Sequence, residues 1–428
     1  MRNKILLIII TLFTGCSVFA ESLVFPPYLH SYGIRKAVPA HLFMILKGAT
    51  KFDDPQGLAT TRLDSWEDPT DKKDDDEVIV YGVNSGRHQI IYNTSMYALA
   101  LYGSKGSGDG QFLYPKGVAA NERGDVYVAD SGNNRLVRLF NPKKGLLWVA
   151  ALKADSGDGS MNGPLRVAID EKGDVYATDA INKKIFVFNK KNEFVHSIPQ
   201  KGQPDIFTGK MSALAVADGC ARWSHFRNER VLFCADKDGT RLWKLGLDGK
   251  VIKSVQMPDG YQAFYGAIDY YHNYWVTDSK KSSLVKFDHN LTLLEIFGKY
   301  GEKDNEFIEP RGITIYKRFG QTFIAEKKGA QYYWTGTKYN GASLKFVNPS
   351  QYDLTVKSTE YSFVSLLSIS GKDTIFYLKR RMIVPPVDKI AITDTTGFGK
   401  SPEFIIKMEP TYSSFTYNAW FYPLTITK

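Results

Sequence analysis

Short apolar runs of four or five residues recur along this chain, and most are followed by a polar turn and a second, alternating run. The apolar runs are rich in β-branched and aromatic residues, which favour β-strands. Apolar and polar residues alternate with a period of two in segments such as 135–140 and 184–188, as in half-buried strands. The apolar runs lie at 78–81, 126–129, 175–178, 231–235, 274–277 and 322–325. This pattern predicts an all-β protein.

A polar residue at the end of the second strand of each unit marks a repeat. Successive anchors are separated by 46, 49, 57, 42 and 48 residues. A period of this length with several short strands per unit is typical of a β-propeller, in which each four-stranded blade buries its faces against its neighbours. The anchors are Asn84, Asp130, Asp179, Asp236, Asp278 and Glu326. Six anchors predict six blades.

The unit is clearest between residues 108 and 135. It reads Gly-Asp-Gly-Gln-Phe at 108–112, Pro-Lys-Gly at 115–117, Gly-Asp-Val-Tyr-Val-Ala-Asp at 124–130 and Asn-Asn-Arg at 133–135. These segments resemble the consensus of NHL repeats, and the resemblance covers roughly residues 41–338. It implies a six-bladed β-propeller of the NHL type. Related six-bladed propellers include amidating lyases and metal-dependent lactonases.

The last blade shows only three strands before its pattern fades. The segment at 41–48 precedes the first blade and resembles the outer strands that end other blades, such as 294–298. We expect it to complete the sixth blade as an N-terminal closing strand, which would remove an exposed sheet edge.

Residues 340–428 form a second region with short strands and turn signals. They predict a small antiparallel β-sandwich of about 85 residues. The stretch at 358–399 resembles the immunoglobulin-like domains that follow propellers in secreted bacterial proteins.

The first twenty residues are typical of an export signal. Arg2 and Lys4 precede an apolar run over residues 5–13 that is too short to span a bilayer. Two processing routes stay open: cleavage after Ala20, or lipidation of Cys16, which would attach the protein to a membrane. Either route predicts an extracytoplasmic protein that is secreted, periplasmic or an outer-surface lipoprotein.

Two further cysteines, Cys220 and Cys234, are expected in the fourth blade. A hairpin disulfide between them is predicted for an oxidising compartment. The alternative is a buried free Cys234 and an unrelated Cys220 in a loop.

The formal net charge is +10. Export disfavours nucleic acid as the partner, so a basic surface points to a protein or an anionic polysaccharide at the cell envelope. The alternative is that the charge serves solubility. Oligomeric state stays open.

Motifs for catalysis are scarce. The chain has no His-Glu-x-x-His, no Gly-x-Ser-x-Gly and no cysteine pair at zinc spacing, so no catalytic residue, metal or cofactor is predicted. The acidic stretches at 68–77 and 155–159 lack EF-hand spacing and are interpreted as solvated loops.

Candidate binding residues lie where the innermost strand of each blade starts beside the central channel. These start positions include Lys116, Arg166 and Arg311, whose converging charges would favour an anion between them. The predicted channel-mouth site is Gln56, Lys116, Arg166, Tyr265 and Arg311, and the predicted loop rim is Arg87, His88, Arg135, Lys183, Arg241, Lys280 and Lys327. The competing interpretation is that these cations pair with the anchor carboxylates and join adjacent blades.

The sequence therefore predicts a non-enzymatic, extracytoplasmic binding or scaffold protein that recognises a protein or an anionic glycan through the loop face of the propeller. The first alternative is a metal-dependent lyase or lactone hydrolase with its site at the channel mouth. The second is a structural subunit of a cell-surface assembly.

Overall fold

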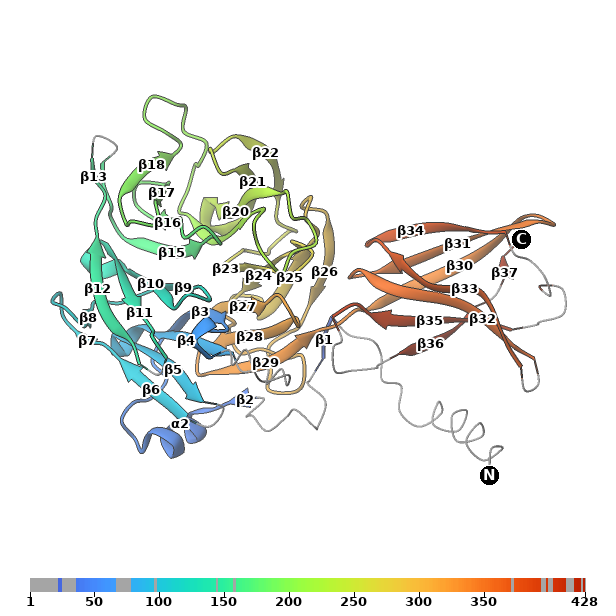
Figure 1. The fold of residues 1–428 in the computed structure, drawn as a ribbon, viewed down its shortest axis with the longest axis horizontal. Coiled ribbons are helices and arrows are strands. Elements are labelled where there is room, and N and C mark those ends of the chain that lie inside the picture. The colour runs from blue at the N-terminus through green and yellow to red at the C-terminus, as the bar shows by residue number, and fades with distance from the viewer. Residues whose placement is uncertain are drawn as a thin grey trace. The chain divides into compact units, whose positions relative to one another are not determined.

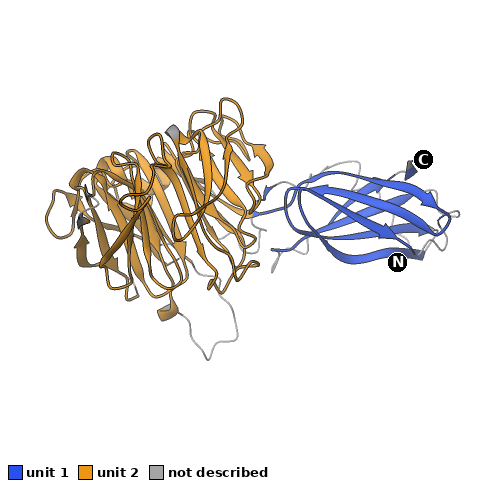
Figure 2. Cartoon of the chain, turned by 90° about the horizontal axis from the view of Figure 1, so that it is seen from above, with its two compact units in different colours: residues 1–24, 335–428 blue, residues 25–334 orange. Residues whose placement is uncertain are grey.

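The computed structural model describes residues 22–24, 36–66, 78–95, 98–143, 145–156, 159–370, 373–393, 398, 403–412, 419–424 and 426–427. The chain divides into two compact units, residues 25–334 and residues 1–24 with 335–428 (Figure 2). The predicted export signal at 1–20 and Cys16 lie outside the described residues, as does the acidic stretch at 68–77. Within the described residues, no helix has the length and hydrophobicity of a membrane span.

Six sheets form the larger unit; five are built from four consecutive strands each, and the sixth combines three consecutive strands with N-terminal ones (Figure 1). The first three are β3 (Pro55–Thr61), β4 (Ile79–Asn84), β5 (Gln89–Ser95) and β6 (Ala98–Tyr102); β9 (Gly117–Ala120), β10 (Asp125–Asp130), β11 (Arg135–Phe140) and β12 (Leu147–Leu152); β15 (Pro164–Ile169), β16 (Val175–Asp179), β17 (Lys184–Phe188) and β18 (Phe194–Ile198). The other three are β19 (Ser212–Asp218), β20 (Arg230–Asp236), β21 (Arg241–Gly246) and β22 (Val251–Gln256); β23 (Tyr265–Ile268), β24 (Tyr274–Asp278), β25 (Ser283–Phe287) and β26 (Leu293–Phe297); β27 (Gly312–Tyr316), β28 (Gln321–Glu326) and β29 (Gly329–Thr335).

The first strands of the six sheets close a ring. β3 contacts β9, β9 contacts β15, and the series continues through β19, β23 and β27 back to β3. Each sheet is therefore one blade around a common channel. The prediction of a six-bladed β-propeller is confirmed.

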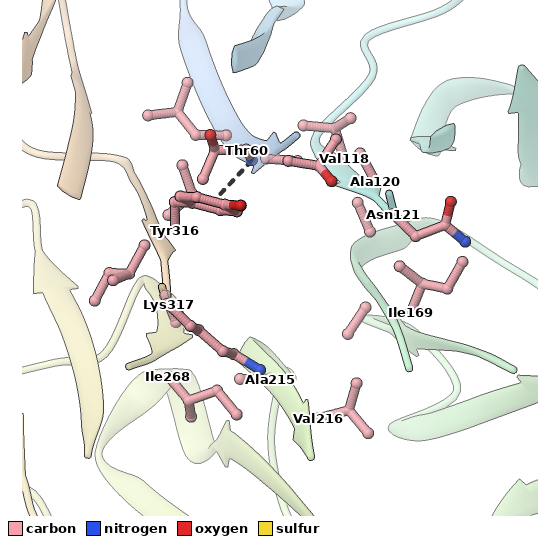
Figure 3. A pocket seen from close by; sticks show the side chains of 18 of the residues that line it. Thr60, Val118, Ala120, Asn121, Ile169, Ala215, Val216, Ile268, Tyr316 and Lys317 are labelled. Atoms are coloured by element: carbon pink, nitrogen blue, oxygen red, sulfur yellow. Dashed lines mark hydrogen bonds between the residues drawn. The ribbon is translucent and has the colours of Figure 1, made fainter. Parts of the chain in front are cut away.

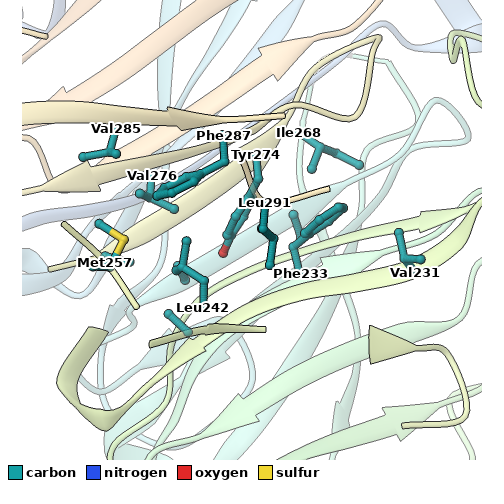
Figure 4. Close-up of a cluster of buried hydrophobic side chains, with 14 of the residues drawn as sticks. Val231, Phe233, Leu242, Met257, Ile268, Tyr274, Val276, Val285, Phe287 and Leu291 are labelled. Carbon is teal, nitrogen blue, oxygen red and sulfur yellow. The ribbon is translucent and has the colours of Figure 1, made fainter. Parts of the chain in front are cut away.

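The blades are held together by apolar side chains between neighbouring sheets. Between blades four and five, Phe233 of β20 stacks on Tyr274 of β24 with ring centroids 5.1 Å apart (Figure 4). Second strands such as β16 and β24 are buried along their whole length, because both of their faces lie between blades. This burial explains the continuous apolar runs in the sequence.

The anchor residues fasten the loop that leads into each blade. Asp130, Asp179, Asp236 and Asp278 are fully buried. Each carboxylate accepts a hydrogen bond from a backbone N–H upstream of its own first strand; the donors are Leu113, Asn162, Thr208 and Gln262. The anchors thus satisfy buried backbone donors, as buried polar groups must.

The N-terminal closing segment differs from the prediction. Residues 41–48 do not form a strand: they lie mostly in the helix α2 (Pro39–Leu46), which begins at Pro39 and ends before Lys47 in the left-handed conformation. Both are typical helix boundaries. Of the N-terminal strands that join β29 in its sheet, the short β2 (Lys36–Ala37) lies opposite Gln331 and Ala330.

Two four-stranded sheets form the smaller unit. One contains β34 (Val387–Ile392), β31 (Gln351–Ser358), β30 (Tyr339–Asn348) and β37 (Ile426–Thr427); the other contains β33 (Asp373–Ile383), β32 (Ser362–Ser370), β35 (Phe404–Pro410) and β36 (Trp420–Leu424). Side chains from both sheets, including Leu344, Val364 and Phe404, bury one core. β37 pairs with β30 in parallel, so the sandwich is not entirely antiparallel. The immunoglobulin-like resemblance stays a prediction.

The remaining elements are short. They are β1 (Leu23–Val24), β7 (Ser104–Lys105), β8 (Gln111–Phe112), β13 (Asp155–Ser156), β14 (Gly159–Ser160) and the 3-10 turns Asp64–Trp66, Ser85–Arg87, Ser131–Asn133 and Lys237–Gly239.

Candidate functional site

The channel has a start face, where the six inner strands begin, and an end face, where they finish. On the start face, three predicted site residues meet at Asp54, which the sequence interpretation had not singled out. Lys116 Nζ lies 2.9 Å from Asp54 Oδ2, Gln56 Nε2 donates to Oδ1 at 2.7 Å, and the Arg311 guanidinium also pairs with Oδ1. Burial raises the pKa of Asp54, but these partners outweigh it and hold the pKa below its ordinary value. Arg311 also pairs with Glu309 at 3.1 Å, so both predicted cations already have carboxylate partners within the protein.

Arg166 and Tyr265 fill the channel on this side rather than facing an open mouth. The Tyr265 hydroxyl donates to the carbonyl of Val118 at 3.3 Å, although β23 and β9 are opposite strands of the ring. The Arg166 guanidinium donates to the carbonyl of Phe264 at 2.9 Å and lies 4.8 Å from the centre of the Tyr265 ring. Burial lowers the pKa of Arg166 to about 10. Arg166 does not join Lys116 and Arg311 at Asp54.

The predicted rim residues lie with their own blades and do not gather at one site. Arg135 pairs with its anchor Asp130 at 2.8 Å, as the competing interpretation expects, and Lys327 pairs with Glu309 at 2.7 Å. His88 is buried and accepts a hydrogen bond from the backbone N–H of Tyr114. Of the other four, Arg87 lies 3.9 Å from Asp53 and Arg241 stacks on Trp243. Lys183 and Lys280 are exposed.

The predicted disulfide is wrong. Cys234 is buried in the middle of β20 opposite Leu214, whereas Cys220 is exposed in the loop after β19. The register explains the difference, because Asp218 at the end of β19 already pairs with Arg230 at the start of β20. Cys220 therefore lies beyond the end of the ladder that holds Cys234.

The end face contains a cavity of about 190 Å³ that all six inner strands line (Figure 3). Its wall combines small apolar residues such as Ala119, Ala215 and Val216 with polar ones such as Asp170 and Glu171. Lys317, which follows β27, extends its side chain past Ile268 toward Ala215 (Figure 3). A long cationic side chain therefore projects into a cavity whose wall is both polar and apolar.

The Lys317 ammonium group makes no hydrogen bond or close ion pair with any residue that the structure describes. Burial lowers its pKa, and the more distant carboxylates of Glu171, Asp218 and Asp269 oppose this effect only in part. A half-buried ammonium group that no described residue pairs with closely is a candidate for binding an anionic ligand.

Lys317 also differs from the residues at the equivalent position of blades two to five. In blades two to five, the residue after the inner strand or at its end is Asn121, Asp170, Asp218 or Asp269. Each of these side chains accepts a backbone N–H of the following turn, from Asp125, Asp174, Cys220 and Asn273 respectively. In blade six the same position holds a lysine that takes no part in such a turn bond. The signal lies at the strand ends of the sequence, whereas the predicted site residues lie at the strand starts.

Asp170 lies in the same cavity wall and is almost completely buried. Burial raises its pKa to about 6, and nearby Asp218 and Asp174 act in the same direction, while the N–H groups of Asp174 and Gly173 oppose it. Lys317 and Asp170 are thus both displaced toward their neutral forms. Groups with such opposed pKa changes are concentrated at functional sites.

Two arginines flank an aromatic residue of the cavity wall. Trp223 lies in the loop between β19 and β20, and its ring centre is 4.9 Å from the Arg222 guanidinium and 4.8 Å from that of Arg318. Arg222 is exposed and Trp223 is half-buried. Stacking on an aromatic ring orients a guanidinium, and the N–H edge of such a group is suited to a carboxylate, sulfate or phosphate in the case of the exposed Arg222.

Comparison with known proteins finds one family match and several similar solved structures. The NHL repeat family matches residues 112–139. Similar solved structures include a streptogramin B lyase (12% identity, TM-score 0.44, covering 67% of this chain and 94% of that one) and a gluconolactonase from Xanthomonas campestris (11%, 0.46, 73% and 97%). Virginiamycin B lyase from Staphylococcus aureus with quinupristin is another (13%, 0.41, 60% and 76%). No curated protein sequence matches this chain.

By its ring of six sheets the chain is a β-propeller, and residues 112–139 match the NHL repeat. The fold assignment rests on the six sheets and the repeat itself. Among the described residues, no three His, Cys, Asp or Glu side chains are grouped as they would be to share a metal ion.

Proposed function

We propose that this protein is an exported, extracytoplasmic binding protein that holds the end of an acidic glycan in the propeller channel at the end face. The observation that carries the proposal is the Lys317 ammonium group, which has no close partner among the described residues and lies in a cavity lined by all six blades. A ligand carboxylate or sulfate would supply the missing partner through a charge-assisted hydrogen bond.

The arginines beside the cavity favour an acidic over a neutral glycan. Arg222 and Arg318 stack on Trp223, and each presents a planar, permanently charged group close to the cavity wall. An acidic sugar that places one charged group on Lys317 could place a neighbouring one on the exposed Arg222. A glycan polymer also suits a chain with a net charge of +10.

The carboxylates of the cavity are compatible with a sugar. Glu171 and Asp170 line the same space and can accept hydrogen bonds from sugar hydroxyl groups. The volume of about 190 Å³ lies below the ~300–1,000 Å³ typical of sites for drug-sized ligands. One sugar residue or the end of a longer chain is therefore the expected occupant.

This site lies at the opposite end of the channel from the one that the sequence predicts. The start face offers cations that Asp54 already compensates and a channel filled by Arg166 and Tyr265. The partner class expected from the sequence, an anionic polysaccharide, is retained.

Calorimetric titration with acidic oligosaccharides tests the proposal. The probes are oligogalacturonate, oligomannuronate and a hyaluronan tetrasaccharide, each with its carboxyl-methylated form as the matched neutral control. We expect at least one acidic probe to bind and its methyl ester to bind at least tenfold more weakly. Because the pKa of Lys317 is lowered, affinity should decline with rising pH before an ordinary lysine would lose its proton. Equal affinity for acid and ester, or no binding by any acidic probe, would refute the proposal.

A further inference from the structure

A second group of polar side chains lies at the end face, between blades four and five. Ser224 and Glu229 lie in the loop between β19 and β20, and His272 lies in the turn between β23 and β24. Ser224 Oγ is 2.6 Å from His272 Nε2, and His272 Nδ1 is 2.6 Å from Glu229 Oε2. A hydroxyl, an imidazole and a carboxylate are therefore joined in the order required for nucleophilic catalysis.

The charge states suit that order. Burial lowers the pKa of His272, so the imidazole is neutral at neutral pH and can accept a proton. Burial raises the pKa of Glu229, but hydrogen bonds from His272, His289 and Lys244 outweigh it, and the carboxylate stays ionised. With Nδ1–H donated to Glu229, the lone pair of Nε2 points to the Ser224 hydroxyl.

His272 departs from the repeat in its backbone as well. Three residues after the strand-end residue, blades two and three have Gly124 and Gly173, both at a φ of 95°. Blade five has His272 at the same position, with a φ of 56°. A histidine in the left-handed region is strained relative to glycine, and such strain is concentrated at functional sites. The repeat therefore accepts a less favourable residue where the imidazole is placed.

We propose that Ser224, His272 and Glu229 act as nucleophile, general base and orienting carboxylate in the hydrolysis of a carboxylic ester. Ser224 Oγ attacks the ester carbonyl carbon while its proton passes to His272 Nε2. The tetrahedral intermediate expels the alcohol, which takes that proton, and leaves an acyl group on Ser224. Water, deprotonated by His272, then attacks the acyl carbon, and a carboxylic acid and free Ser224 are released.

The position of the group indicates its substrate. Trp223, next to Ser224 in the chain, lines the channel cavity, and Lys317 is close enough to His272 to lower its pKa. An O-acyl group on the glycan bound in the channel is thus the expected substrate, and this part rests on the proposed function. Because Ser224 is only 1% exposed, the loop at 219–229 must open for the ester to reach it.

The same contacts could instead join the two blades without any chemistry. The other charged or titratable groups around the imidazole are Lys244, whose ammonium pairs with Glu229; His289, 3.4 Å from Glu229; and the more distant Asp269 and Lys317. A purely structural network predicts a serine with no special reactivity. Nucleophilic reactivity therefore separates the two possibilities.

Labelling with phenylmethanesulfonyl fluoride provides the test, with the modified residue mapped by peptide mass spectrometry. We expect Ser224 of the full chain to be sulfonylated and p-nitrophenyl acetate to be hydrolysed. Ser224→Ala should lose both activities. His272→Gly installs the residue that blades two and three use, so it preserves the turn, and it should slow labelling of Ser224 by at least 100-fold.

Two outcomes would overturn the proposal: no label on Ser224 after hours with millimolar reagent, or equal labelling rates in wild type and His272→Gly. Circular dichroism melts of both variants check that they fold. Lys317→Met separates this proposal from the proposed function, because it should abolish binding of acidic oligosaccharides while Ser224 is still labelled.

Discussion

Replacement of Asp170 by Asn should stabilise the protein at neutral pH. The carboxyl is buried and its pKa rises from the ordinary 3.8 to about 6, which corresponds to about 3 kcal/mol against the charged folded state. Asn keeps the oxygen that accepts the N–H groups of Gly173 and Asp174. Asn121 already makes the equivalent turn bond in blade two. The substitution therefore removes a desolvated charge without loss of the turn.

The sign of the pH dependence follows from the raised pKa. A protonated Asp170 contributes its full stability below the unfolded pKa of about 3.8, and this contribution is lost as the pH rises through about 6. Asp170→Asn should consequently match the wild type near pH 4 and exceed it by up to about 3 kcal/mol at pH 7.5, a rise of about 6 °C in melting temperature.

Differential scanning calorimetry at both pH values measures this effect. Asp174→Asn is the matched control, since it removes one negative charge from the same turn at a half-exposed side chain and should change stability by less than about 0.5 kcal/mol. The reasoning fails if Asp170→Asn is no more stable than wild type at pH 7.5, or if its gain is equally large at pH 4.

Three other substitutions test the remaining contacts. Asp54→Asn should lower the free energy of unfolding by about 1 kcal/mol at pH 7, after screening by solvent at this partly exposed site. Because the folded-state pKa of Asp54 is lowered, this loss should vanish as the pH falls through that pKa. Urea unfolding at pH 7 and pH 3 measures the difference. Glu229→Gln should lower the free energy of unfolding by about 3 kcal/mol, because it leaves the buried Lys244 ammonium group without its carboxylate partner. An unchanged unfolding midpoint in guanidinium chloride would contradict this role of the Glu229–Lys244 pair. Cys220→Ser and added dithiothreitol should both leave the melting temperature unchanged, and Ellman's reagent should react with Cys234 only after unfolding. A lower melting temperature in the presence of dithiothreitol would instead support a disulfide between Cys220 and Cys234.

The architecture was predictable because it depends on local patterns repeated six times. Apolar second strands and acidic anchors such as Asp130 recur at each blade, and both are tied to burial between neighbouring sheets. The closing segment was missed for a local reason: a short apolar run does not distinguish a strand from a helix. Pro39 at the helix start and Lys47 at its end were the available signals.

The site was less predictable because it depends on which charges meet. Lys116 and Arg311 were recognised by residue type, but the carboxylate that binds both, Asp54, lies just outside the aligned start positions. Lys317 becomes visible only when the strand ends of all blades are compared. The link between Ser224 and His272 spans 48 residues and depends on the packing of two blades. No local pattern encodes it.

The central claim is that ligand binds at the end face of the channel through Lys317. Calorimetric titration of the best-binding acidic oligosaccharide into Lys317→Met and Lys116→Met tests it most directly, because the two substitutions remove the same charge from opposite ends of one channel. The account predicts a loss of at least tenfold in affinity for Lys317→Met and less than twofold for Lys116→Met. The reverse order would place the ligand at the start face and contradict the account.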